Sequence, residues 1–513
     1  MLLLRVALII VSLDFTRAAS SSGCCSILKS NITAAPNSKA YNATIYGFWS
    51  GQVRDNKPTC VVQPTTREHV AAVVRTLTRL QCQFSVKGGG HTPFAGAASI
   101  NDGVTIDLAK LNNISVDKNV GIAHVGAGLK WGQIYEYLET KGMMVSGGRA
   151  SLVGIGGLVV GGGYSWFAPQ KGFVADTVVN FELVVGNGSI INVNATSNSD
   201  LFVGLKGGGN NFGIVTRYDL ESFPFEKLWG GIMIYPSSTA KAQINFFTNF
   251  TNHISDDPKA NFLNIWSYRQ VSGSQSILNV IDYVAPVEAP AIYSDALAIP
   301  NLISSTMRIT NVSSLTDELA GGTSTLNSRY IFVTTTFSNS AEMYETAVNI
   351  SNKHLEPLKN TTGLVWSILF QPIPLIVSEH SITTGGNIMG VDRNKDNLTL
   401  FLVYVTWLEA SDDQKFTDAA YATVDEINAV AGNLGVTNSF IYLNYAGQKQ
   451  NPLAGYGEEN IEKMRVLSRK YDPQGTFQKL VKGGFKIPGM EIVMDWEVGA
   501  LENAWTEESV LLY

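Results

Sequence analysis

The chain has 513 residues, of which 45% are hydrophobic and 16% are charged, a balance that excludes a disordered chain and predicts two or three globular domains. Its formal net charge is -6, and its lysine and arginine residues are scattered along the sequence. This excludes the basic footprint of a nucleic-acid-binding protein, so no nucleic-acid partner is expected.

The N-terminal residues predict passage through the secretory pathway. Residues 1–22, MLLLRVALIIVSLDFTRAASSS, contain a short apolar run with Arg5 near its start and small residues at Ala18 and Ala19. The run is too short to cross a bilayer and predicts a signal peptide of residues 1–19, cleaved near Ala19, with a buried N-terminal strand as the alternative. Sequons for N-glycosylation support secretion, and after cleavage no membrane anchor is expected. These ten sequons lie at Asn31, Asn42, Asn113, Asn187, Asn194, Asn249, Asn311, Asn349, Asn360 and Asn397.

Cysteine and histidine usage bears on cross-links and metals. The chain has four cysteines, Cys24, Cys25, Cys60 and Cys82, all near the N-terminus. They allow up to two disulfides, whose connectivity the sequence leaves open. No Cys-x-x-Cys pair and no His-x-x-x-His pair occur among the 6 histidines, so no metal site is predicted.

From Cys60 the pattern reads strand, helix, strand. Residues 60–64 and 82–89 are apolar strand segments, and residues 65–80 between them carry apolar positions at helical spacing after a capping box from Thr65 to Glu68. Further strands follow at 104–111 and 123–129, with a helix at 130–142. Such alternation predicts an α+β or α/β domain that holds its ligand at strand ends and loops.

After about Phe223 the glycine density falls and longer apolar strands begin. Those strands are predicted at 262–270, 330–337, 363–374 and 400–407, and helical segments such as 412–432 alternate with them. This pattern predicts a second α+β domain with a large antiparallel sheet. Residues 440–447 and the helix 458–477 then close the fold.

Glycines concentrate in three loops of the first half. Residues 147–163 contain eight glycines in 17 positions, where average usage of about 7% predicts roughly one. The dinucleotide pattern G-x-G-x-x-G fails because Val159 stands where a third glycine is needed, and a P-loop fails because the chain has no Gly-Lys pair. Loops that expose bare N–H groups remain suited to a large anionic ligand, and His91 follows the triple glycine 88–90 directly. A lone histidine is usually packed or solvated, but this setting indicates a flavin dinucleotide.

Five motifs in this order carry a family resemblance: VKGGGH, VGIGGLVVGGGY, GGGNNFGIVT, YLNYA and KYDPQGTF. Over residues 45–488 the chain resembles the secreted fungal branch of the berberine-bridge-enzyme-like oxidases, within the vanillyl-alcohol-oxidase flavoprotein superfamily. The resemblance implies an FAD-binding domain of two α+β subdomains (the PCMH type) and a substrate domain with an antiparallel sheet over the flavin. The implied segments are 1–19 (signal peptide), 20–226 (FAD domain), 227–435 (substrate domain), 436–490 (C-terminal segment returning to the FAD domain) and 491–513 (tail).

The resemblance also implies one covalent FAD, attached through His91. Many relatives have a second link through a cysteine, but the matching position here is Ala150 and no cysteine lies beyond Cys82, so no cysteinyl link is expected. Val153 matches the family's oxygen-access position, with simple packing as the alternative. The implied cofactor-binding residues are Lys87, Gly88, Gly89, Gly90, His91, Ala150, Val153, Gly154, Gly156, Gly157, Gly161, Gly162, Gly213, Ile214, Val215 and Asn444.

The candidate catalytic residues are Tyr164, Tyr442 and Tyr445, each with a structural role as the alternative. A tyrosine has an ordinary pKa of about 10, and the sequence identifies no cationic neighbour, so a concerted proton transfer is expected rather than a stored phenolate. Three further residues on second-domain strands face either the substrate or the core: Tyr268, Gln371 and Tyr404.

The predicted function is a secreted, monomeric, FAD-dependent oxidase. It takes a hydride from an alcohol, a sugar or a secondary metabolite, and O2 reoxidises the flavin to give H2O2. The alternatives are a dehydrogenase that reacts slowly with oxygen, an oxidative cyclase, and a non-catalytic secreted glycoprotein that keeps the fold. The sequence does not predict which substrate is used.

Overall fold

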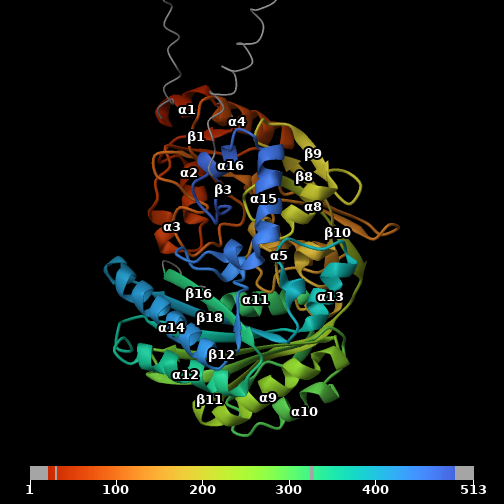
Figure 1. The fold of residues 1–513 in the computed structure, drawn as a ribbon, viewed down its shortest axis with the longest axis vertical. Coiled ribbons are helices and arrows are strands. Elements are labelled where there is room, and N and C mark those ends of the chain that lie inside the picture. Colours follow the sequence, from red (N-terminus) through yellow and green to blue (C-terminus); the bar gives the residue numbers. More distant parts are fainter. Residues whose placement is uncertain (1–20, 29–31, 324–327, 491–513) are drawn as a thin grey trace, which may run out of the picture.

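Three sheets with packed helices form the chain, which confirms the predicted α+β class (Figure 1). The computed structural model describes residues 21–28, 32–323 and 328–490. The predicted signal peptide, residues 1–19, and the predicted tail, residues 491–513, lie outside the described residues.

The first sheet is built from the N-terminal strand–helix–strand pattern. Its order is β1-β2-β4-β3, in which the last three strands run parallel. Because β3 ends at Lys87, the triple glycine and His91 leave the carboxyl end of a buried strand. The strands are β1 (Thr33–Ala34), β2 (Cys60–Val62), β3 (Phe84–Lys87) and β4 (Val104–Asp107); the helices around them are α1 (Ser21–Ile27), α2 (Lys39–Tyr46), α3 (Gly51–Asp55) and α4 (Arg67–Arg79).

Helix α4 forms where its spacing predicts but begins one residue late. It buries Val70, Val74 and Leu77 against the sheets. The predicted cap at Thr65 is wrong: because the helix begins at Arg67, the hydroxyl of Thr66 accepts from the backbone N–H of His69 at 3.2 Å.

The second sheet has six strands; one of the other two glycine loops follows β7 and the other leads into β10, the central strand. Its order is β5-β6-β10-β8-β9, and β7 pairs with β10. The strands are β5 (Ile114–Asp117), β6 (Ile122–Gly126), β7 (Met143–Val145), β8 (Val178–Val184), β9 (Ile190–Val193) and β10 (Ile214–Pro224); the helices are α5 (Trp131–Glu139), α6 (Ile155–Val160), α7 (Ala168–Lys171) and α8 (Ser199–Leu205).

The third sheet is antiparallel throughout and has nine strands, in the order β14-β11-β13-β12-β17-β18-β16-β19 with β15 beside β11. Helices α9, α10, α12 and α14 cover the face turned away from the first two sheets (Figure 1). The strands are β11 (Leu228–Pro236), β12 (Ala260–Arg269), β13 (Ser274–Tyr283), β14 (Ser304–Ser305), β15 (Arg308–Thr310), β16 (Arg329–Ser338), β17 (Val365–Ile373), β18 (Leu398–Trp407) and β19 (Thr437–Asn438); the helices are α9 (Ala240–His253), α10 (Ser294–Leu297), α11 (Val312–Thr323), α12 (Ala341–Leu355), α13 (Leu375–Thr383) and α14 (Asp413–Asn433).

The C-terminal segment packs against the first half of the chain. Helix α15 (Glu458–Tyr471) contacts α8, and Phe84 of β3 donates its N–H to the carbonyl of Leu480 at 3.0 Å, just after α16 (Thr476–Lys479). The amide of Asn211 also donates to the carbonyl of Phe485 at 2.9 Å. The predicted domain boundaries remain predictions, although β10 and β11 on either side of residue 227 belong to different sheets.

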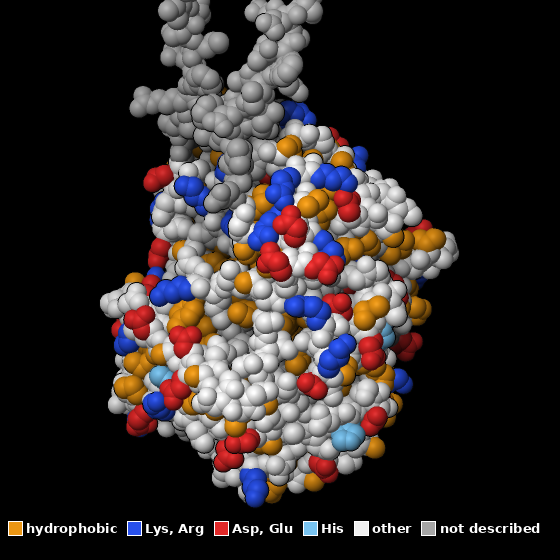
Figure 2. Space-filling view, in the orientation of Figure 1, with side chains coloured by type: hydrophobic (Ala, Val, Ile, Leu, Met, Phe, Trp, Pro, Cys, Tyr) orange, Lys and Arg blue, Asp and Glu red, His pale blue; other side chains and the backbone are white. Residues whose placement is uncertain are grey.

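The surface mixes both signs of charge. On the face drawn in Figure 2, acidic and basic side chains are interspersed. Helix α15 illustrates this, since Arg465 contacts both Glu458 and Glu462 at 2.7 and 3.0 Å. Within the described residues, no helix has the length and apolarity that crossing a bilayer requires.

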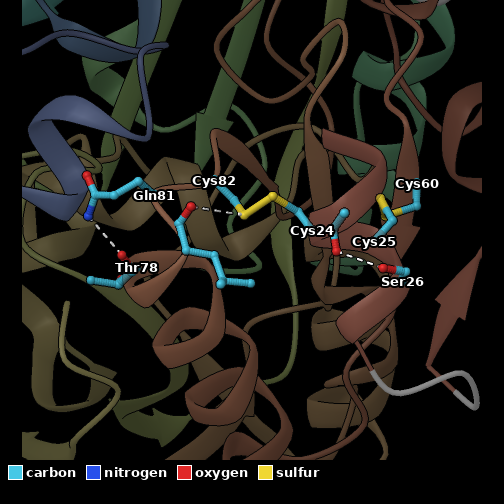
Figure 3. The surroundings of a disulfide bond; sticks show 9 residues. Cys24, Cys25, Ser26, Cys60, Thr78, Gln81 and Cys82 are labelled. Carbon is cyan, nitrogen blue, oxygen red and sulfur yellow. Dashed lines mark hydrogen bonds between the residues drawn. A yellow bond between two sulfur atoms is a disulfide. The ribbon is translucent and has the colours of Figure 1, made fainter. Parts of the chain in front are cut away.

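Two disulfides tie the N-terminal helix to the first sheet. They join Cys24 to Cys82 and Cys25 to Cys60, so α1 is held from both sides (Figure 3). Cys82 lies two residues before β3, which leads into the glycine–histidine loop. The cross-links therefore restrain the strand that positions His91.

Candidate functional site

A cavity of about 500 Å³ lies between the glycine loops and the nine-stranded sheet. That volume is in the range of pockets that hold cofactors and small ligands. One wall is made of loop backbone from the first half of the chain, and the facing wall is made of side chains from the third sheet. Residues 477–485 and 442–446 of the C-terminal segment complete the lining.

The loop wall depends on two glycine loops that touch. A Cβ added to Gly89 would lie 2.4 Å from the Cα of Gly154, and the reverse holds for Gly154. Gly90 has φ +71°, a left-handed conformation that favours glycine. The Gly154 loop is fastened by the N–H of Trp131, which donates to the carbonyl of Val153 at 2.9 Å. The glycines are therefore needed first to bring the two loops together.

His91 leaves this wall and faces the cavity. Its ring stacks on Trp49, with ring centroids 4.2 Å apart and planes 16° from parallel. Removal from water, and then the charge of Lys130, lower the pKa of His91 to about 3. The imidazole is neutral at physiological pH and keeps a lone pair on one ring nitrogen.

A third part of the wall comes from the C-terminal segment. Asn444 donates from Nδ2 to the carbonyl of Leu158 at 2.9 Å and lines the cavity. Gly161 leaves the room for that side chain, since a Cβ there would lie 2.1 Å from Asn444 Oδ1. The C-terminal segment is thus locked to the loop that follows α6.

The sheet wall is built from every second residue of its strands, as the strand period requires. On β12, Leu263, Ile265 and Ser267 face the cavity, while Trp266 and Tyr268 pack in the core beneath the helices. The facing residues of the other strands are mostly aliphatic. The aliphatic ones are Ile232, Leu278, Val280, Val365, Leu369 and Leu402, and beside them lie Phe332, Ser367, Tyr404 and Thr406.

The three predicted tyrosines line the cavity close to one another, in different surroundings. The hydroxyl of Tyr164 donates to the carbonyl of Pro372 at 2.8 Å, and burial raises its pKa above the ordinary value. Burial also raises the pKa of Tyr442, whose hydroxyl oxygen accepts from Asn444 at 3.1 Å. The hydroxyl oxygen of Tyr445 accepts from Nη2 of Arg149 at 2.9 Å.

Arg149 is the charged group at this end of the cavity. It lies in the loop between β7 and α6 and is 7% exposed. Its Nη2 also donates to Oε1 of Gln371 at 2.6 Å, and its guanidinium lies 5.3 Å from the centroid of the Tyr164 ring. The sequence prediction missed Arg149, although its place beside Ala150 within a glycine-rich loop was a usable signal. It supplies the cationic neighbour that the sequence did not identify.

Most predicted site residues meet in this cavity. Lining residues among them are Gly88, Gly89, Gly90, His91, Ala150, Val153, Gly154, Gly156, Gly157, Gly213, Ile214, Val215, Asn444, Tyr164, Tyr442, Tyr445 and Tyr404. Their individual roles remain predictions.

Five predicted residues lie outside the described lining. Lys87 is buried with Nζ 3.2 Å from Oδ2 of Asp107, and Gly161 and Gly162 pack on Asn444 and Met389. Gln371 reaches the site only through Arg149, and Tyr268 donates its hydroxyl to the carbonyl of Lys359 at 3.1 Å.

Comparison with known proteins identifies the family. Residues 58–194 match the family described as FAD binding domain. The chain is 38% identical over 435 residues to the FAD-dependent monooxygenase drtC of Aspergillus calidoustus, a match that covers 83% of this chain and 82% of that protein. The chain belongs to the family of FAD-linked oxidoreductases that includes drtC.

Two further likenesses extend over most of this FAD-linked oxidoreductase. It is 36% identical over 480 residues to the FAD-dependent monooxygenase sdcF of Emericella nidulans, covering 92% of this chain and 99% of that protein. The fold matches BBE-like 1 of Physcomitrella patens with a TM-score of 0.73 at 17% identity, covering 92% and 99% of the two chains. The enzyme class and the fold family predicted from the motifs are therefore confirmed.

The loop wall of this oxidoreductase suits FAD. Gly157 is exposed to the cavity, and a Cβ added to it would meet no described atom within 4 Å, so bare backbone faces open space there. Backbone N–H groups without side chains are the kind of surface that receives a pyrophosphate. Within the described residues, no group of His, Cys, Asp or Glu is arranged to hold a metal ion.

Proposed function

We propose that this protein is an FAD-dependent oxidase in which His91 carries the flavin covalently and Tyr445 is the base. The observation that carries the proposal is the position of His91: a neutral imidazole faces the same cavity as Tyr445 and its arginine partner. The substrate is a small organic molecule, because a cavity of about 500 Å³ is of the size that holds cofactors and small ligands.

FAD, when bound, supplies a two-electron acceptor for C–H oxidation and a site at which O2 is reduced to H2O2. The residues that would hold it are the bare-backbone positions Gly88, Gly156 and Gly157, with His91 as the anchor. A neutral imidazole nitrogen can form a bond to carbon, whereas a protonated one cannot. Both cysteine pairs are joined in disulfides, which supports a single histidyl link.

Tyr445 is proposed to take the proton from the substrate O–H or N–H. A guanidinium that donates to a phenol oxygen stabilises negative charge on that oxygen. The contact with Arg149 therefore supports Tyr445 as the proton acceptor in the concerted transfer expected from the sequence. Tyr164 is less suited, because its hydroxyl is committed to the carbonyl of Pro372.

Secretion, glycosylation, a monomeric state and the domain division at residues 226–227 belong to the same proposal. Two disulfides are typical of an oxidising compartment, and six of the nine sequon asparagines that the structure describes, such as Asn113 and Asn349, are exposed. We also propose that Val153, which lines the cavity, controls oxygen access.

The test is the absorption spectrum of the secreted protein before and after acid precipitation. We expect yellow colour that stays with the precipitated wild type and is lost from the precipitate of His91→Ala. The matched control is His69→Ala, a half-buried histidine in the first turn of α4, which should keep the colour. A colourless wild type expressed with ample riboflavin would contradict the proposal and favour a non-catalytic glycoprotein.

A second candidate function is oxygen insertion, which the names of the two fungal relatives favour. Turnover under ¹⁸O2 separates the two. An oxidase releases the label as hydrogen peroxide, whereas a monooxygenase places one labelled atom in the organic product.

A further inference from the structure

We infer that the substrate is an apolar molecule that presents one acidic oxygen, a phenol, enol or carboxylic acid, to Arg149. This rests on the proposed function, because it assigns the substrate class of the same cavity. The names of the two fungal relatives give no substrate, and the sequence leaves alcohols, sugars and secondary metabolites open.

The first argument is an unpaired donor. Nη2 of Arg149 is occupied by Gln371 and Tyr445, but Nη1 is buried without a hydrogen-bond partner among the described residues. A buried donor left unpaired costs about 1–3 kcal/mol, and more when the group is charged. A ligand oxygen that accepts from Nη1 would remove that cost.

Gln371 adds a second unpaired donor beside the first. Its Oε1 accepts from Arg149, which fixes the orientation of the amide, and its Nε2 is buried without a described partner. Both unsatisfied groups are therefore donors, and an acceptor is what satisfies them. A ligand group that only donates, such as an ammonium, would leave both unpaired.

The second argument is charge. None of the described carboxylates forms an ion pair with Arg149. Asp282 is fully buried, and neither of its carboxyl oxygens has a described hydrogen-bond partner. Burial raises the pKa of Asp282 well above its ordinary value, and Arg149 opposes this only in part, so the protonated, uncharged form is favoured. A buried cation without a charged partner is costly, and an anionic ligand oxygen would supply the partner.

The third argument is the mostly aliphatic sheet wall, which favours an apolar substrate over a sugar. Ile265, Leu278, Leu369 and Leu402 face the cavity with aliphatic side chains. Sugar hydroxyls held against such a wall would lose their hydrogen bonds to water without replacement. The hydroxyl of Ser367 is already bonded to Ser267 at 2.9 Å. An apolar skeleton suits this wall, and Arg149 receives its single acidic oxygen.

The test measures binding of three naphthalene probes to the flavin-loaded protein by calorimetry: 2-naphthol, 2-naphthoate and the neutral 2-methoxynaphthalene. We expect at least one acidic probe to bind about tenfold to a hundredfold more tightly than the neutral one, as removal of a charge-assisted hydrogen bond implies. Tighter binding of 2-naphthol indicates that the acidic oxygen of the substrate is a phenol, and tighter binding of 2-naphthoate indicates a carboxylic acid.

Two variants of Arg149 test whether this residue causes the preference for acidic probes. Arg149→Met should abolish the preference while changing the affinity for 2-methoxynaphthalene by less than about twofold. Arg149→Lys should retain part of the preference. Arg269→Gln is the matched control, because Arg269 is an exposed arginine at the end of β12 that also borders the cavity; it should keep the full preference.

Two outcomes would overturn the inference. One is equal binding of all three probes by the wild-type protein. The other is loss of the preference in Arg269→Gln but not in Arg149→Met. The flavin spectrum of each sample is recorded first. Flavin-loaded protein without an acid preference contradicts this inference alone, whereas protein that never takes up flavin contradicts the proposed function as well.

Discussion

The two walls of the cavity are made in different ways. The loop wall uses backbone: Gly89 and Gly154 meet at a distance that no side chain permits, and Gly157 offers bare main chain to the cavity. The sheet wall uses side chains that alternate along strands such as β18, where Leu402 faces the cavity and Val403 faces the helices. A wall of backbone suits a cofactor common to a whole family, and a wall of side chains can change with the substrate.

The two walls also differ in the substitutions that they tolerate. A glycine in a close contact cannot be replaced by any larger residue without moving a loop. An aliphatic residue facing open space can change size at a smaller cost, because fewer neighbours lose contacts. Substitutions at close glycine contacts in the loop wall should therefore reduce the amount of folded holoprotein, whereas substitutions in the sheet wall should mainly change substrate binding.

The largest effect is expected from Gly89→Ala. Its Cβ would lie 2.4 Å from the backbone of Gly154, so the loops must separate, and we expect folded holoprotein to fall at least about tenfold, typical of severe overpacking. Gly157→Ala should leave the melting temperature of flavin-free protein nearly unchanged but weaken FAD binding, because its Cβ points into open cavity.

The control for both glycine changes is Gly321→Ala in α11, where a Cβ meets no described atom within 4 Å. It should be neutral or stabilising by up to about 1 kcal/mol. Flavin content is measured by absorbance and unfolding by thermal denaturation. Normal FAD uptake by Gly89→Ala would refute the backbone account of the loop wall.

The next effect is expected at the point where the two walls meet. Tyr445→Phe removes the proposed base and should slow flavin reduction by about 10²–10⁴-fold, with flavin content unchanged. Tyr164→Phe loses only a hydroxyl bonded to the carbonyl of Pro372 and should slow it much less. Anaerobic stopped-flow absorbance measures both rates; the reverse order would transfer the role of base to Tyr164.

The loop wall could be predicted from the sequence because its information is local. Glycine runs such as 88–90 and 154–157 mark backbone contacts without reference to the rest of the chain, and they placed His91 and Ala150 correctly at the cavity. The same reasoning also names Gly161 and Gly162, which pack on Asn444 and Met389, because a glycine needed for packing cannot be told from one that faces a ligand. The cofactor-binding role of these glycines and of Lys87 stays a prediction.

The sheet wall could not be predicted in the same way. The long apolar strands were recognised, but which face of each strand is covered by helices depends on register with strands far along the chain. Tyr268 and Tyr404 look alike in the sequence, yet Tyr268 lies beneath the helices and Tyr404 in the cavity. Arg149 was missed because its partners, Gln371 and Tyr445, are more than two hundred residues away.

A smaller effect tests the alternation of β18. Val403→Ala, in the core beneath the helices, should lower the free energy of unfolding by about 1–3 kcal/mol. Leu402→Ala, facing the cavity, should cost less stability and instead raise the KM for an apolar substrate by about tenfold, the scale set by lost methylene contacts. Chemical denaturation and steady-state kinetics check the pair. Equal losses of stability would mean that Leu402 is also a core residue.

The smallest effect concerns the protonation of His91. Because its pKa is lowered from 6.5 to about 3, the imidazole stays neutral as the pH falls from 7.5 to 5. The rate at which flavin-free protein forms its covalent bond to added FAD should therefore change less than about twofold, whereas a histidine with an ordinary pKa would lose about thirtyfold of its neutral form.

The same shift makes the unfolded chain the better proton acceptor between pH 6.5 and about 3, so His91 contributes stability above pH 6.5 that is lost as the pH falls through this window. Flavin-free His91→Asn should accordingly lose less stability than wild type on acidification from pH 7 to 5, measured by thermal denaturation at each pH. A thirtyfold fall in the attachment rate, or identical pH profiles of stability for the two proteins, would show that His91 is hydrated and has the ordinary pKa of a histidine. The loop wall would then be more open to water than its contacts with Trp49 and the glycines imply.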